Sequence, residues 1–283
     1  MKLIFLHIPK AGGTTLHRVL GRMYQGSEIF TIQVRGHHLG LEEFTSLSPE
    51  RKERIRLLKG HMPFGLHTYF TTEPVRYITI FRDPVDRIIS HYYYVLRSKT
   101  HYLYQKVARS GMSLMDYALS DLSGELDNHQ CRSLVGENIP INSFSAEFYQ
   151  EAIKNLQEYF VSFGLVEEFD KSLLLLKKDL QWDRYPYYLR LNSRSQTESA
   201  EISDADRAAI AKRNYWDVRL YDWAKAEFNR RIESIKNIDE ELKILQISCE
   251  AFQNGMDSGI IAEKKAQKSN GGFRSFILKT LAR

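Results

Sequence analysis

The first 23 residues contain an apolar run, a glycine-rich turn and an amphipathic run in direct succession, which constrains the fold of this chain strongly. The segment from Lys2 to Ile8 is short and apolar, as is typical of a strand inside a parallel sheet. After the turn, apolar residues recur with helical spacing at Leu16, Val19, Leu20 and Met23. The pattern predicts a buried strand, a tight turn and a helix.

The turn itself has residue types that bind an anion. Gly12 and Gly13 allow the backbone to approach a ligand closely. Thr14 or Thr15 is expected to cap the helix, whose free N–H groups and positive dipole end face the same point. Lys10 adds a full positive charge. We expect a ligand that carries phosphate or sulfate; an ordinary turn with a solvated lysine is the alternative.

A second candidate for anion binding follows the strand predicted over residues 76–81. Arg82 ends this strand, and Asp83-Pro84 begins a helix expected to run to about residue 97. The carboxyl ends of parallel strands are where ligands bind, so Arg82 is expected at the same edge of the sheet as the first turn.

In this second helix the predicted core stripe consists of Val85, Ile88, Ile89, Tyr92 and Leu96. The residues expected on or near the opposite face are Asp86, Arg87, Ser90 and Tyr94. We expect Arg82 and Ser90 to bind one anion, through a charge-assisted guanidinium contact and a hydroxyl. A surface ion pair between Arg82 and Asp86 is the alternative.

Together the two motifs resemble those of the sulfotransferases that use 3′-phosphoadenosine 5′-phosphosulfate (PAPS), in particular the heparan and chondroitin sulfotransferases and their bacterial relatives. The segment I-P-K-A-G-G-T-T at residues 8–15 is similar to their 5′-phosphosulfate loop, I-P-K-[TS]-G-G-T-[ST], except that Ala11 lacks the hydroxyl. The segment R-D-P-V-D-R-I-I-S-H-Y-Y-Y at residues 82–94 resembles their 3′-phosphate motif. The chain has neither G-x-x-x-x-G-K-[ST] nor G-x-G-x-x-G.

The resemblance covers most of residues 1–230 and implies a function. It assigns the 3′-phosphate of PAPS to Arg82 and Ser90. It assigns the phosphosulfate to Lys10, the backbone of Ala11, Gly12, Gly13, Thr14 and Thr15. The implied reaction moves the sulfuryl group of PAPS to a hydroxyl of a small molecule or glycan, for which we expect a carbohydrate, and it needs no metal.

In-line sulfuryl transfer needs a base for the acceptor proton and positive charge at the leaving oxygen. The segment G-H-M-P-F-G at residues 60–65 resembles the family's base-bearing motif, which makes His61 the expected general base and Lys10 the residue that neutralises the leaving oxygen. His7 is expected to pack or to orient the loop and is the next candidate for the base. His37-His38 is interpreted as a surface pair, and His91 lies in the Tyr-rich helix.

The remaining pattern predicts one α/β domain of three layers, with a mainly parallel sheet as in nucleotide kinases. Further strands are expected over residues 28–34, 55–59 and 159–166. Helices are expected from Pro49, through residues 169–180, from the cap Ser203-x-x-Asp206, and over residues 215–235. Residues 101–145 are interpreted as irregular and residues 251–272 as a mobile linker. The domain is assigned to residues 1–250 and a flexible tail to 251–283.

The net charge of +5 is located at the end of the chain. Residues 264–283 contain six Lys or Arg and no acid, and the rest has 34 basic and 35 acidic residues. This distribution argues against a nucleic-acid partner. Phe273, Phe276, Ile277 and Leu281 are compatible with a weak amphipathic helix that docks on the body, on a partner or on an anionic membrane surface; solvated disorder is the alternative.

Cys131 and Cys249 form no C-x-x-C pair, which argues against a disulfide framework or zinc site and fits a reducing compartment. No apolar run approaches about 18 residues, and no signal peptide precedes the first strand. This differs from the membrane-anchored Golgi members of the family. We expect a soluble cytoplasmic enzyme or an excised catalytic domain.

Two other functions stay open at this point. Residues 77–83 superficially match the strand and magnesium-binding aspartate of an ATP-dependent kinase, but the matching G-K-[ST] is absent. A non-catalytic binding module would keep Arg82 and Ser90 but would not need His61. Residues 128–132 and 192–194 are expected to border the acceptor cleft.

Overall fold

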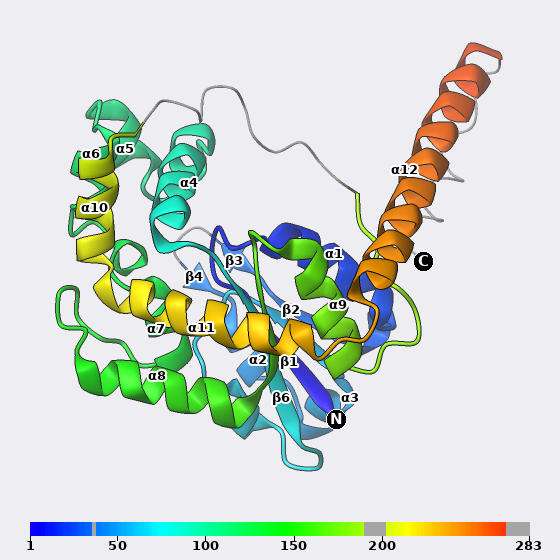
Figure 1. Ribbon diagram of the computed structural model, residues 1–283, viewed down its shortest axis with the longest axis horizontal. Helices are drawn as coiled ribbons and strands as arrows, with labels where there is room; N and C mark the ends of the chain where they lie inside the picture. The colour runs from blue at the N-terminus through cyan, green and yellow to red at the C-terminus, as the bar shows by residue number, and fades with distance from the viewer. Residues whose placement is uncertain (36–37, 190–201, 270–283) are drawn as a thin grey trace.

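A five-stranded parallel sheet forms the centre of the protein (Figure 1). The computed structural model describes residues 1–35, 38–189 and 202–269. The strands are ordered β2-β5-β1-β6-β7, so β1 is central. Their bounds are β1 Lys2–Leu6, β2 Ile29–Ile32, β5 Leu57–Gly60, β6 Val75–Phe81 and β7 Phe160–Leu165. β3 (Val34–Arg35) and β4 (His38–Leu39) form a separate antiparallel pair. The predicted parallel α/β class is confirmed.

Helices cover both faces of the sheet and make a three-layer structure. α1 (Gly13–Met23), α9 (Phe169–Asp179) and α12 (Ile238–Ser269) pack against one face. α7 (His129–Val135), α8 (Ala146–Tyr159) and α11 (Tyr215–Glu233) pack against the other. Alternation along β1 explains how one strand serves both layers, because Leu3 and Phe5 face the first group and Ile4 and Leu6 the second.

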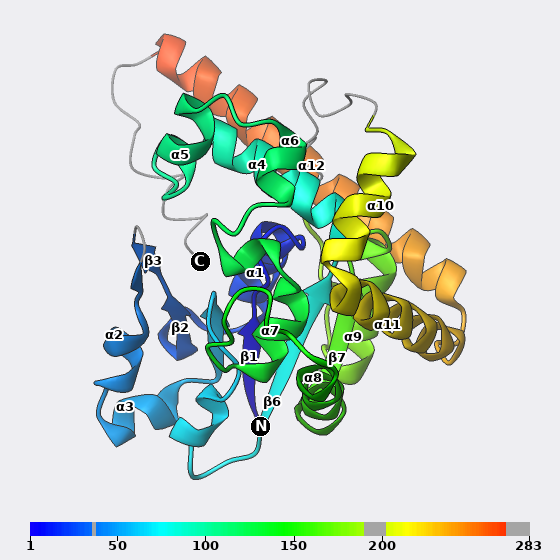
Figure 2. The same cartoon turned by 90° about the vertical axis from the view of Figure 1, so that its left-hand side faces the viewer.

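A third group of helices stands beyond the carboxyl ends of the strands, away from the N-terminus (Figure 2). It consists of α4 (Pro84–Arg97), α5 (Tyr104–Arg109), α6 (Leu114–Ala118) and α10 (Asp204–Arg213), which share their own buried apolar cluster. The interpretation of residues 101–145 as irregular is therefore wrong, since α5, α6 and α7 lie there. These helices have only five to seven residues each, which is too short for a helical period to be recognised. α8 was not foreseen either.

Short elements complete the described chain. They are α2 (Leu41–Thr45), α3 (Pro49–Arg54) and the 3₁₀ turns η1 (Gly26–Glu28), η2 (Leu66–Tyr69) and η3 (Gly124–Leu126). The predicted helix starts at Ser48, Asp83 and Ser203 are confirmed, because each side chain accepts a backbone N–H at the beginning of α3, α4 or α10.

The C-terminal segment differs from its prediction. α12 continues to Ser269, so the interpretation of residues 251–269 as a linker is wrong; residues 270–272 lie outside the described residues, as does the 273–281 segment. Leu245 and Cys249 anchor the first part of α12 in the core, and its far end extends beyond the rest of the described chain (Figure 1). Searching the described residues finds no helix with the length and apolar character needed to cross a membrane.

Candidate active site

The turn between β1 and α1 has the shape of an anion-binding loop, although its cap differs from the expected one. Gly12 is the N-cap residue of α1, with φ 68°, and no side chain caps this helix end. Thr14 and Thr15 lie inside the first turn of α1, so the prediction that one of them caps the helix is wrong. A backbone N-cap leaves the N–H groups of this turn without a competing side-chain acceptor, which suits an anionic ligand.

Glycine stands at positions 12 and 13 for two different structural reasons. Gly12 and Lys10 both adopt the left-handed region, with φ 68° and 66°, which a glycine tolerates and most other residues do not. Gly13 is helical, but a Cβ atom built on it would lie 1.7 Å from Nε2 of His7. The space beside Gly13 is thus occupied by a histidine ring.

The two predicted anion-binding segments contact each other directly. Nη1 of Arg82 donates a hydrogen bond of 3.1 Å to the carbonyl oxygen of Lys10. The Nζ atom of Lys10 lies 4.3 Å from the ring centroid of Tyr94 on α4. Ser90 precedes Tyr94 by four residues and so shares its face of the helix. The structure therefore brings the loop and the Arg82–Ser90 segment to one place at the carboxyl edge of the sheet.

Two details of α4 differ from the sequence interpretation. Asp86 forms its ion pair with Arg207 of α10, at 2.8 Å, which replaces the alternative of a surface pair with Arg82. Arg87, expected near the solvent face, has no exposed surface. Its Nη2 donates to the carbonyl oxygen of Glu125 at 2.6 Å. The helical period gave the wrong expectation for Arg87 because it assumes that buried positions are apolar, whereas this buried side chain has a polar partner.

The backbone of His7 fixes the tautomer of the His61 ring. Its Nδ1 lies 2.9 Å from the carbonyl oxygen of His7. Because a carbonyl only accepts, Nδ1 carries the proton in the neutral ring and Nε2 keeps its lone pair. Burial lowers the pKa of His61, opposed by the His7 carbonyl and by the charge of Glu125. His61 is therefore neutral at neutral pH, with Nε2 able to accept a proton.

Three histidines form a cluster around this point. The rings of His7 and His61 stack with centroids 4.2 Å apart, and Nε2 of His17 lies 3.2 Å from Nδ1 of His7. Burial, with some help from the other two histidines and Lys10, lowers the pKa of His7 well below its usual value. Burial and then Lys59 lower the pKa of His17 to about 4. The sequence predicted that His7 packs or orients the loop; the packing is confirmed, and the orienting role stays a prediction.

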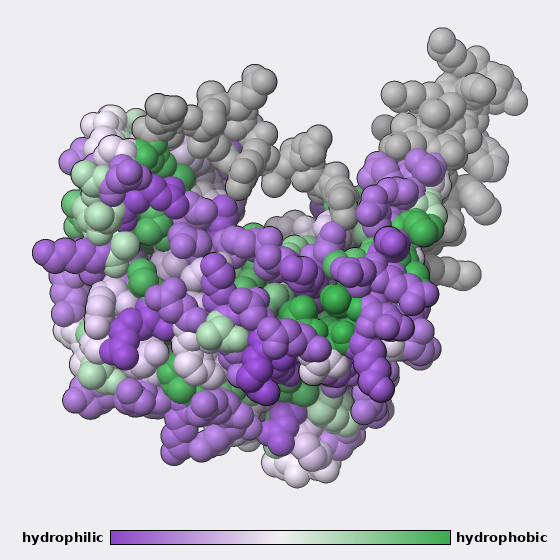
Figure 3. Space-filling view, viewed as in Figure 1, coloured by the Kyte–Doolittle hydropathy of each residue, from purple (hydrophilic) through white to green (hydrophobic). Residues whose placement is uncertain are grey.

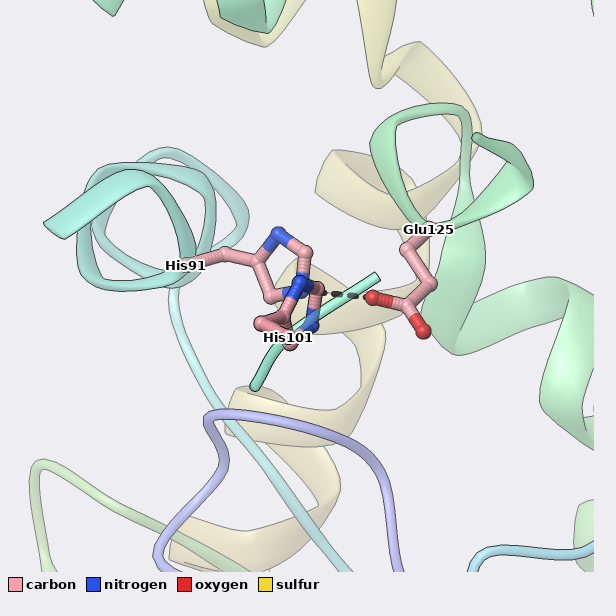
Figure 4. A group of neighbouring side chains, drawn as sticks. All are labelled: His91, His101 and Glu125. Atoms are coloured by element: carbon pink, nitrogen blue, oxygen red, sulfur yellow. Dashed lines mark ion pairs between the residues drawn. The ribbon is translucent and has the colours of Figure 1, made fainter. Parts of the chain in front are cut away.

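A buried network of polar side chains lies behind α4 and was not foreseen. Nε2 of His91 forms an ion pair of 2.5 Å with Glu125 (Figure 4). Nδ1 of His91 contacts the hydroxyl of Tyr117 at 2.6 Å. His91, Glu125 and His101 each offer one atom of a type that can bind a metal ion, and these three atoms lie within 4.8 Å of one another. The guanidinium of Arg87 already supplies positive charge beside Glu125, which opposes a cation there. We interpret these contacts as the ones that hold η3 against α4.

Residues 128–132, which the sequence predicts beside the acceptor, connect α7 to α11 and to the backbone of Arg82. The Asp217 carboxylate accepts the backbone N–H groups of Gln130 and Cys131 at 3.0 and 2.8 Å. The Gln130 amide in turn pairs with the backbone N–H and carbonyl of Arg82. Asn128, Gln130, Cys131 and Arg132 are largely buried, and Asn128 lines one of the two recesses described below. The expectation that this segment borders the acceptor cleft stays a prediction. Residues 36–37 and 192–194, which include His37, lie outside the described residues.

Two recesses adjoin this framework. One, of about 420 Å³, is lined by Phe169, which lies next to Gly12, and by Tyr188. Its charged lining residues are three acids, Glu167, Glu168 and Asp170, and one base, Lys171, so its net charge is negative. Such charge disfavours a phosphate. The other, of about 520 Å³, is lined by Phe144, Tyr215 and Trp216. In the space-filling view the surface is mainly hydrophilic, and it dips between the α4–α10 group and α12 (Figure 3).

Comparison with known proteins was made on the sequence and on the structure. The sequence profile of the galactose-3-O-sulfotransferase family matches residues 1–267. Heparan-sulfate 6-O-sulfotransferase 3 of Mus musculus is 23% identical over 289 residues, which cover 84% of this chain and 60% of the relative. Heparan-sulfate 6-O-sulfotransferase 2 of Gallus gallus is 26% identical, with 84% and 70% covered. The chain thus spans 60% of the length of the mouse relative.

A solved structure gives a weaker similarity. Mouse sulfotransferase SULT7A1 complexed with PAP, the 3′,5′-bisphosphate product of PAPS, is 14% identical, with a TM-score of 0.36 over 75% of this chain and 63% of the other.

Proposed function

The chain belongs to the galactose-3-O-sulfotransferase family, and from this premise we propose that it transfers the sulfuryl group of PAPS to a hydroxyl of a carbohydrate. The observation that carries the proposal is the hydrogen bond from Arg82 to the carbonyl of Lys10. It places two anion-binding segments side by side, and PAPS carries one anionic group at each end of its ribose.

The donor groups are assigned by the chemistry of each segment. We assign the phosphosulfate to Lys10, to Thr14 and Thr15, and to the backbone from Ala11 to Gly13 at the start of α1. We assign the 3′-phosphate to Arg82 and Ser90, which supply a guanidinium and a hydroxyl. The donor is a co-substrate and is consumed in each turnover.

In the proposed reaction, His61 is the general base and Lys10 stabilises the leaving group. The acceptor oxygen forms a bond to sulfur while the bond between sulfur and the bridging oxygen breaks. The acceptor proton moves to Nε2 of His61, and the electron pair of the broken bond leaves with PAP, where the ammonium of Lys10 offsets the new charge. His61 is neutral before this step, as a base must be.

A carbohydrate acceptor is supported by two independent likenesses. The family profile is named for galactose, and the two relatives described above are named for heparan sulfate. Both names specify a sugar hydroxyl as the acceptor.

The experiment is a transfer assay with labelled PAPS and a panel of acceptors: galactose-terminated oligosaccharides, heparan-type oligosaccharides, lipids and small alcohols. We expect label to move to at least one carbohydrate, and to move about 10²-fold to 10⁴-fold more slowly when His61→Ala replaces the parent. Transfer to a non-carbohydrate alone would refute the acceptor class. ATP consumption that stops on chelation, without sulfuryl transfer, would favour a kinase.

A further inference from the structure

His7 lies between the donor loop and the proposed base and contacts both. On one side its ring fills the space that a side chain at Gly13 would need, since a Cβ atom there would lie 1.7 Å from Nε2 of His7. On the other side the ring stacks on His61, with a centroid distance of 4.2 Å and an interplanar angle of 26°. A single ring thus spans the distance from α1 to His61.

The contact explains why residue 13 is glycine. Gly12 has a positive φ and needs glycine for its backbone. Gly13 is an ordinary helical residue, for which alanine would be the better helix former. The three atoms nearest to a Cβ atom at this position, at 1.7 to 2.3 Å, all belong to the ring of His7. By contrast, a Cβ atom on Gly21 in the same helix would meet nothing closer than Nζ of Lys59 at 3.7 Å.

We infer that His7 is a positioning residue that couples the donor loop to the base, through the interlock of its ring with Gly13 and its stack on His61. The inference rests on the proposed function, because it takes His61 as the base. The His7 ring fixes the plane of the His61 ring, and the His7 carbonyl holds the proton of His61 on Nδ1. The loop and the base therefore keep one spacing, which in-line transfer requires.

The stack also suits the state that follows proton transfer. When Nε2 of His61 takes the acceptor proton, the ring becomes a cation that faces the neutral His7 ring, and a cation is attracted to an aromatic face. A charged His7 would repel it instead. Burial keeps His7 neutral, and the contact with His17 holds the ring in place.

The test compares Gly13→Ala, His7→Ala and the double variant with the parent, using PAP affinity, turnover and thermal unfolding. Gly13→Ala should weaken PAP binding about 10-fold or more and lower the melting temperature, because its methyl group and the His7 ring need the same space. His7→Ala should bind PAP like the parent but turn over about 10-fold more slowly. The double variant should regain the PAP affinity of the parent and keep the slow turnover of His7→Ala.

The matched control is Gly21→Ala, which adds the same methyl group to α1 in open space and should behave like the parent. His7→Asn keeps a polar group toward His17 without the ring and covers the case in which His7→Ala fails to fold. A double variant that binds PAP as weakly as Gly13→Ala would overturn the inference, as would parent-like turnover of His7→Asn. If the parent does not bind PAP, the proposed function fails, and recovery of the melting temperature in the double variant still decides the His7–Gly13 interlock.

Discussion

The two halves of the proposed donor site are built differently. The loop from Lys10 to Gly13 joins β1 to α1 and takes its shape from its own backbone, with positive φ angles and an N-cap glycine. Arg82 also stands between a strand and a helix, but its backbone is held by Gln130, 48 residues away. α7, which carries Gln130, is fixed by Asp217 from α11. A motif thus supplies the ligand-binding groups, and distant parts of the chain set their position.

We expect the largest effect from removing His61, the proposed base. His61→Ala should lower turnover by about 10²-fold to 10⁴-fold, because a general base acts in the transition state, and should leave PAP affinity nearly unchanged. Steady-state kinetics and a PAP titration check this on a protein with parent-like unfolding. Near-normal turnover would move the base elsewhere, with His7 the next candidate.

Lys10→Ala should harm both steps, unlike His61→Ala. Its charge meets the phosphosulfate in the ground state and more strongly in the transition state. We expect PAP affinity to fall about 10-fold and turnover to fall further. A variant with weakened binding and unchanged turnover at saturating donor would show that Lys10 binds the donor without helping the chemistry.

The Arg82 half of the site is tested by removing Asp217, whose carboxylate holds α7 and so supports the Arg82 backbone. Asp217→Ala should lower the free energy of unfolding by about 2–3 kcal/mol, because it leaves two buried N–H groups of α7 without an acceptor. Asp222→Ala, a change at another acidic position on α11, is the control. Unfolding in urea gives both values. Equal stability of the two variants would mean that α7 does not depend on this carboxylate.

The smallest expected effect is on pH dependence. The pKa of His61 is lowered by burial and partly restored by the charge of Glu125. The acid limb of kcat/KM should therefore lie below about pH 6.5, and Glu125→Gln should move it to still lower pH. A limb that moves upward would contradict this sign. His101→Gln alters a neighbour of Glu125 without removing the charge and should leave the limb nearly in place.

The parts of this structure that the sequence predicted are local ones. The strands β1, β6 and β7 and the starts of α3, α4 and α10 follow from apolar runs and capping residues within a few positions. The resemblance identified the two motifs from sequence alone, and the structure places them together. What made this possible is that strand, turn and helix are contiguous in the chain.

The rest depended on contacts between distant residues. Arg87 seemed solvent-facing by its helical position but is buried against η3. The sequence predicted that Gly13 lets the backbone approach a ligand. In the structure the ring of His7 occupies the space that a side chain at Gly13 would need, and no spacing rule reveals this contact. Gln130 reads as one polar residue among many until its amide is found on the Arg82 backbone. Such roles are set by tertiary packing, which a single sequence does not display.

The central claim is that one nucleotide binds to both halves of the site, and the most direct measurement is a calorimetric titration of the parent and Arg82→Ala with two ligands. PAP and adenosine 5′-monophosphate differ only in the 3′-phosphate. We predict that the parent prefers PAP by about 10-fold to 100-fold, the range of one charge-assisted contact, and that Arg82→Ala loses this preference by weakening PAP alone. Equal affinity of the parent for the two ligands, or an equal loss of both in the variant, would contradict the account.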